Sequence, residues 1–268
     1  MSNEIIKVPV TRYLEGKEFY ADRTDNALKS LQDNGYRALF MPELADTRIN
    51  SDKGSRIWQT WFTSPSIRAT GITRQGNPVV VYGHVDNYFS DHGNIRKTIE
   101  ENRLVNYAGI IPQEEFQRLV DLEGIKDQQG NKLVFVVDYE ELKNSKSGII
   151  PVKRALKHPQ TIPFLGGEER AQRYLERHEE VYGDQIGIWH SDDLREQPLG
   201  RLVYLIYDIN GLDGINCINN NGRFVGVRDD VPQKILHPCL EQILKISEDF
   251  VPQIAREEYE ARLRSLHQ

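Results

Sequence analysis

The chain has 268 residues, of which 38% are hydrophobic and 28% charged, a balance that excludes a disordered chain and allows a large buried core. Its formal charge of -6 disfavours a surface for nucleic acid, which would have to neutralise many phosphates. No stretch approaches the roughly 18 apolar residues of a membrane-spanning helix, and the start lacks the pattern of a signal peptide, so we expect a cytoplasmic protein with no membrane partner.

The first third of the chain predicts short strands and one amphipathic helix. Residues 5–10 form the first strand, and a helix capped by Thr24 or Asp25 runs to about Gln32 with its leucines inward. Residues 36–41 form a buried strand. The segment 41–55 is predicted to be a flexible loop, because proline, asparagine, aspartate and glycine recur along it.

The middle of the chain predicts an antiparallel meander followed by helices. Strands are expected over 56–62, 67–73 and from Pro78 to Tyr82, where an unbroken run of valines is typical of a strand covered on both faces. Helices over 95–103 and from Pro112 onward follow, then a buried strand over 132–137.

The last part of the chain contains the clearest helix pattern, Glu168 to Tyr182, opened by a pair of glycines. Strands are expected over 185–189, 201–209 and 223–228. We therefore predict an α+β protein: a mixed, largely antiparallel sheet with packed helices, in one domain over 1–268 whose C-terminal segment, 232–268, is helical.

Two His-x-Asp pairs follow predicted strands. His84 and Asp86 come after the valine-rich strand, and His190 and Asp192 come after the strand over 185–189. Because residues two apart in an extended chain point to the same side, each pair could present an imidazole and a carboxylate to one metal ion. The sequence thus predicts a divalent metal site of zinc or manganese at these four residues.

A metal held in this way would activate water, and the first functional hypothesis is a metal-dependent hydrolase acting on a small polar substrate. Glu168, Glu169 and Asp138 are its candidate general bases or further ligands. The alternative is a non-catalytic soluble binding or protein-interaction protein, because histidines and acids after strands also serve in ordinary turns and caps. Its partner would be a small molecule, another protein, or a second copy bound through the C-terminal helix.

Anion binding is a further hypothesis for the glycines Gly166 and Gly167. Free amides at a helix start could hold a phosphate near Lys153, Arg154, Lys157 and His158. The two glutamates directly after the glycines favour instead a helix start that is stabilised by its own acidic side chains. The two cysteines, Cys217 and Cys239, lie far apart and are predicted to be reduced thiols.

Overall fold

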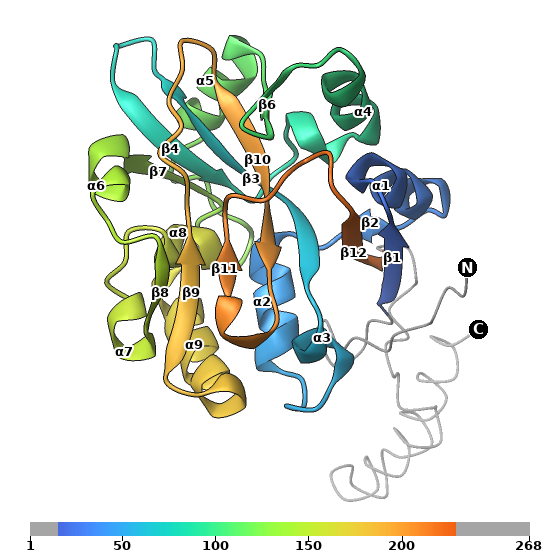
Figure 1. The fold of residues 1–268 in the computed structure, drawn as a ribbon, viewed down its shortest axis with the longest axis vertical. Helices are drawn as coiled ribbons and strands as arrows, with labels where there is room; N and C mark the ends of the chain where they lie inside the picture. Colours follow the sequence, from blue (N-terminus) through green and yellow to red (C-terminus); the bar gives the residue numbers. More distant parts are fainter. Residues whose placement is uncertain (1–15, 229–268) are drawn as a thin grey trace, which may run out of the picture. The chain divides into compact units, whose positions relative to one another are not determined.

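A computed structural model describes residues 16–228 of the chain, and their strands form two sheets (Figure 1). The smaller sheet has the order β1-β12-β2, and the larger has the order β7-β4-β3-β10-β11-β9-β8, with β6 beside β10 and β5 beside β6. The strands are β1 Lys17–Ala21, β2 Arg37–Ala38, β3 Phe62–Ile72, β4 Pro78–Gly83, β5 Leu104–Val105, β6 Ala108–Ile110, β7 Val134–Asp138, β8 Gly148–Pro151, β9 Gln185–Trp189, β10 Leu199–Leu205, β11 Leu212–Asp213 and β12 Gly222–Val227.

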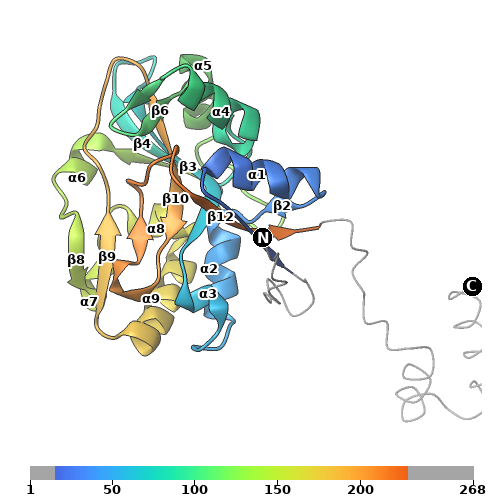
Figure 2. The ribbon, with the colours of Figure 1, turned by 45° about the vertical axis from the view of Figure 1, so that its right-hand side comes forward.

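Helices cover both faces of the larger sheet. Figures 1 and 2 show α2 beside α9 and α1 beside α4, on different sides of the strands. The α-helices are α1 Thr24–Asp33, α2 Met41–Ile49, α3 Arg56–Gln59, α4 His92–Glu100, α5 Gln113–Asp121, α6 Tyr139–Lys143, α7 Val152–Ala155, α8 Thr161–Leu165 and α9 Glu168–Tyr182; short 3-10 helices are η1 Tyr88–Ser90 and η2 Asp208–Asn210.

Alternate side chains of β4 enter two separate hydrophobic cores. Val80 and Tyr82 pack in one core with the residues of α2, α8 and α9, whereas Val81 packs in the other with those of α1, α4 and α5. Both faces of this strand are therefore buried, which explains its uninterrupted valine run. Among the described strands β11 pairs with β9 in parallel and the other pairs are antiparallel, so the predicted α+β class with a mixed, largely antiparallel sheet is confirmed.

The segment 41–55, predicted to be a flexible loop, instead contains the helix α2, and that prediction is wrong. Pro42 stands in the first turn of α2, where a missing amide hydrogen costs nothing. Arg48 on this helix is fully buried and donates to the carbonyl oxygens of Ile57, Thr60, Leu205 and Ile206 and to the Tyr174 hydroxyl at 2.9–3.3 Å. Tertiary hydrogen bonds, which local composition does not reveal, thus hold this segment in place.

Other predicted elements match the structure to different degrees. The helix over 168–182 and the strand over 185–189 have the predicted bounds. The strand over 36–41 is reduced to β2, and the strand over 56–62 is largely α3. The predicted strand 5–10 and helical segment 232–268 lie outside the described residues. Within those residues, no helix combines the length and the apolar character that a membrane crossing requires.

Candidate binding surface

Three loops meet near the start of β10, and Arg201 on that strand joins them. They are the turn 106–107 between β5 and β6, the loop 190–198 after β9, and the segment 214–221 between β11 and β12, which together we call the three-loop surface. Arg201 is 3% exposed and donates to the carbonyl oxygens of Asn106 and Ile215 at 2.6 and 2.8 Å and to the Asp193 carboxylate at 2.9 Å. One buried side chain therefore fixes all three loops.

Burial and charge act against each other at this junction. Burial acts to raise the pKa of the Asp193 carboxyl, but hydrogen bonds from Asn106 and Arg201 outweigh it and leave the pKa below its usual value. The neighbouring Asp213, on β11, has a pKa raised to about 6, mainly by burial, and its carboxylate accepts the Ile215 amide hydrogen at 2.8 Å. Burial also lowers the pKa of Arg201, so the bonds to Asp193 only partly offset the cost of burying its charge, and the charge on Asp213 is costly as well.

Tyr107 protrudes from this surface in a strained backbone conformation. Asn106 and Tyr107 have φ of +48° and +65° and form the two-residue turn between β5 and β6. Such turns need positive φ at both central residues and favour Asn-Gly, so an aromatic residue in the second position is costly. The Tyr107 side chain is nevertheless 60% exposed. The protein therefore maintains strain at a residue whose ring faces solvent.

The segment 214–221, which is bonded to this turn, is rich in amide side chains. The segment 214–221 carries asparagines at 216, 219, 220 and 221, and Ile215 is 37% exposed. The amide of Ile218 donates to the Tyr107 carbonyl oxygen, which ties this segment to the turn. Cys217, also here, is a half-buried free thiol, whereas Cys239 lies outside the described residues. Flexible asparagine side chains beside rigid aromatic ones are a frequent composition of protein-binding surfaces.

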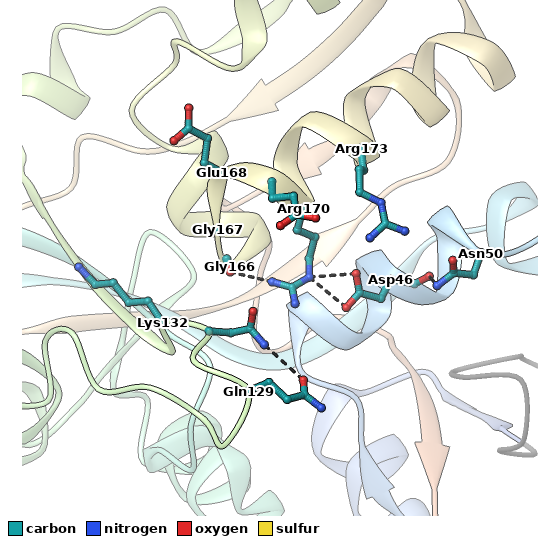
Figure 3. A pocket seen from close by; sticks show the side chains of 11 residues that line it. Asp46, Asn50, Gln129, Lys132, Gly166, Gly167, Glu168, Arg170 and Arg173 are labelled. Carbon is teal, nitrogen blue, oxygen red and sulfur yellow. Dashed lines mark hydrogen bonds and ion pairs between the residues drawn. The ribbon is translucent and has the colours of Figure 1, made fainter.

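A hollow lies at the start of α9, with a volume of about 540 Å³. Figure 3 shows Arg170 between Asp46 and Gly166; its guanidinium bonds both Asp46 carboxylate oxygens at 3.0 Å and the Gly166 carbonyl oxygen at 2.7 Å. The basic residues 153, 154 and 157, expected near these glycines, do not line this hollow. Arg170, one of the basic residues that line this hollow, is therefore already paired with a carboxylate of the fold.

The two residues of the first predicted metal-binding pair differ in burial. His84 is 3% exposed; its Nε2 donates to the Pro163 carbonyl oxygen and its Nδ1 accepts from the Ser66 hydroxyl, both at 2.9 Å. Burial lowers the pKa of this imidazole to about 4. Asp86, in contrast, is exposed. Both ring nitrogens of His84 thus serve the hydrogen bonding of the core.

The second pair, His190 and Asp192, begins the loop 190–198. His190 is buried, its Nε2 lies 3.0 Å from the Ser145 hydroxyl, and its ring packs on that of His158 at 5.5 Å. Asp192 is exposed, and its carbonyl oxygen accepts from the Tyr139 hydroxyl at 2.6 Å. The two histidine rings have different aromatic neighbours. The ring of His84 contacts Phe135, and the ring of His190 contacts His158.

The three predicted bases stand at helix starts. Glu168 and Glu169 are exposed in the first turn of α9, and Asp138 caps α6 by accepting the Glu141 amide hydrogen at 2.8 Å. These are positions where the helix dipole favours carboxylates. Among residues 16–228, no three or more His, Cys, Asp and Glu side chains are grouped so that they could hold a metal ion.

No protein-family model matches this chain, and no curated protein does. It is similar to a solved structure described as "Accommodation of massive sequence variation in Nanoarchaeota by the C-type lectin fold", with 57% identical residues and a TM-score of 0.74, over 82% of this chain and 100% of the other. This chain belongs to the C-type lectin fold family.

Membership in the C-type lectin fold family overturns the hydrolase hypothesis. A close relative with this fold favours a binding role, and the described residues offer no grouped ligands for a metal. The metal-dependent hydrolase and its metal-binding character were wrong predictions; the alternative, a non-catalytic binding protein, agrees better with the relative. The prediction failed because the His-x-Asp pattern is short. It occurs with histidines that form hydrogen bonds inside a core as well as with histidines that bind a metal ion.

Arg201 and Tyr107 were not among the site residues predicted from the sequence. A signal for the first was present, because an arginine in the apolar run 201–206 must find acceptors if the strand is buried. A signal for the second was weaker: Asn-Tyr between two short apolar pairs resembles a hairpin turn only if the tyrosine is allowed a positive φ.

Proposed function

We propose that this protein is a non-catalytic binding protein that captures a protein or peptide partner on the three-loop surface. The observation that carries the proposal is Tyr107, a tyrosine 60% exposed at a strained turn that is fixed from below by the buried Arg201. Backbone strain persists only where the surrounding structure enforces it, and it concentrates at sites of function.

The chemistry of the surface supports a polypeptide partner. Exposed aromatic residues act as anchors at protein interfaces, and asparagine side chains supply hydrogen bonds that adapt to different partners. Ile215 adds apolar area beside the turn. The related structure is described in terms of massive sequence variation accommodated by its fold. A surface whose backbone is held by buried groups can change its exposed side chains without losing its shape.

A display experiment tests the proposal. Random peptides displayed on phage are selected on the full-length protein, and the enriched peptides are measured on Tyr107→Ala and Ile215→Asp variants. We expect each substitution to weaken binding about tenfold or more, because truncating an anchor at an interface costs at least about 1.4 kcal/mol.

The matched control is Ile125→Asp, which places the same charge at an isoleucine 41% exposed outside the three loops. It should leave binding within about twofold. Peptides that bind wild type and both surface variants equally well would refute the proposal, provided that all variants unfold at the wild-type urea concentration.

A further inference from the structure

A positively charged segment stands out in this acidic chain. Residues 142–167 contain no aspartate or glutamate but five lysines and arginines, although the whole chain carries a net charge of -6. Such a bias over so long a stretch produces a local positive potential. The basic residues are Lys143, Lys146, Lys153, Arg154 and Lys157.

Part of this segment lines an open pocket of about 280 Å³ next to β8 and α7. Three of its cationic side chains line the pocket together with polar and apolar groups, and no carboxylate does. The lining includes the exposed cations Lys146, Arg154 and Lys157 and the less exposed residues Ser145, Ile150 and His158. The pocket therefore has the volume for a small molecule and charge of one sign.

The three cations have no ionic partner among the described residues. Lys146, Arg154 and Lys157 are exposed, and none forms an ion pair there, whereas nearby Lys143 pairs with Glu140 at 3.5 Å. Like charges gathered around one hollow repel one another. A bound anion would relieve that repulsion, and nothing within residues 16–228 supplies one.

The floor of the pocket is already fixed by hydrogen bonds. His158 Nδ1 accepts the Gln160 amide hydrogen at 3.1 Å, so the ring proton is on Nε2, which donates to the Lys146 carbonyl oxygen at 3.2 Å. His190 holds the Ser145 hydroxyl at 3.0 Å from below. The chain segment that carries Ser145 and Lys146 is thus preorganised by two buried imidazoles, which lowers the entropy cost of binding.

We propose that this pocket binds a tetrahedral oxyanion, the phosphate or sulfate group of a small ester or of a modified polypeptide. The arginine fork matches two oxygens of such a group, and two lysines add point charges from other directions. A single carboxylate would leave much of this positive charge uncompensated. The site goes beyond the proposed partner binding at the three-loop surface and does not depend on it.

The test is an NMR titration of the full-length protein at low salt with inorganic phosphate and, separately, inorganic sulfate. We expect saturable shifts centred on the amides of residues 145, 146, 157 and 158, with dissociation constants of about 10 mM or tighter. The double variant Arg154→Gln with Lys157→Gln should bind at least tenfold more weakly. Raising the salt should also weaken binding, because the cations are exposed.

The matched control for charge is Lys29→Gln, which removes a lysine paired with Asp33 on α1. It should change the affinity less than twofold. Shifts that do not saturate, or an equal loss in Lys29→Gln, would overturn the proposal. Urea unfolding of each variant checks that the fold is kept. We expect no loss of stability, because all the substituted side chains are at the surface.

Four further ligands then identify the source of the anion: glucose 6-phosphate, a phosphoserine peptide, and the unphosphorylated form of each. Tighter binding of the sugar phosphate than of inorganic phosphate supports a small ester, and tighter binding of the phosphopeptide supports a modified chain. A stronger response to sulfate supports a sulfate ester. If the unphosphorylated forms bind equally well, the oxyanion proposal is wrong.

Discussion

Two buried arginines organise two different parts of this molecule. Arg48 is fully buried in the core and donates to neutral acceptors alone, four carbonyl oxygens and the Tyr174 hydroxyl. Arg201 is almost as buried, but it pairs with the Asp193 carboxylate and with carbonyl oxygens of exposed loops. The same side chain therefore joins strands and helices in one place and the loops of the three-loop surface in the other.

The difference lies in what surrounds the acceptors. The carbonyl groups around Arg48 are inside the fold, where water cannot replace a lost donor, and Trp58 stacks near its guanidinium at 5.2 Å. Asn106 and Ile215, which accept from Arg201, are exposed residues. We infer that Arg48 determines global stability, whereas Arg201 determines the shape of the three-loop surface.

The largest expected effect is that of Arg48→Met. Methionine keeps the apolar stem but leaves the buried carbonyl groups without a donor, so the free energy of unfolding should fall by about 3–5 kcal/mol. Urea denaturation followed by circular dichroism measures it. Arg74→Met, at an arginine whose side chain is 66% exposed, should change it by less than about 0.5 kcal/mol. Equal effects of the two substitutions would contradict the role given to Arg48.

These two arginines also show what the sequence could predict. The helix α9 and the strand β4 were predictable because their apolar patterns repeat with the periods of a helix and of a fully covered strand. The helix α2 was not, because Arg48 finds its acceptors in residues distant in sequence. The three-loop surface was only partly predictable: its loop 190–198 was selected for His190 and Asp192, whereas Asp193 is the residue that bonds to Arg201 on β10.

A second prediction concerns Asp213, which lies beneath the three-loop surface. Its pKa is raised from 3.8 to about 6, so the folded state holds this proton more tightly than the unfolded state does. Its contribution to stability is therefore present below pH 3.8 and is lost as the pH rises through about 6. The loss amounts to about 2–3 kcal/mol at 1.36 kcal/mol for each pKa unit.

Asp213→Asn removes this titration. The unfolding free energy of the variant minus that of wild type should therefore increase by about 2–3 kcal/mol between about pH 4 and pH 7. Urea curves measured across this range give the difference directly. Asp52→Asn, at an exposed carboxylate, should give no such trend. A flat difference for Asp213→Asn would show that burial of this carboxylate is fully compensated in the fold.

The smallest effect on stability, and the most local, is expected for Arg201→Met. Water can reach the exposed loop residues that lose their donor, so the free energy of unfolding should fall by only about 1–2 kcal/mol, less than for Arg48→Met. Asp193 loses its ion pair, and the three loops lose their common anchor. Hydrogen exchange should therefore accelerate at the amides of Ile215 and Ile218 but not at those of β4. Faster exchange throughout the sheet would instead make Arg201 a second determinant of the whole core, and the contrast with Arg48 would disappear.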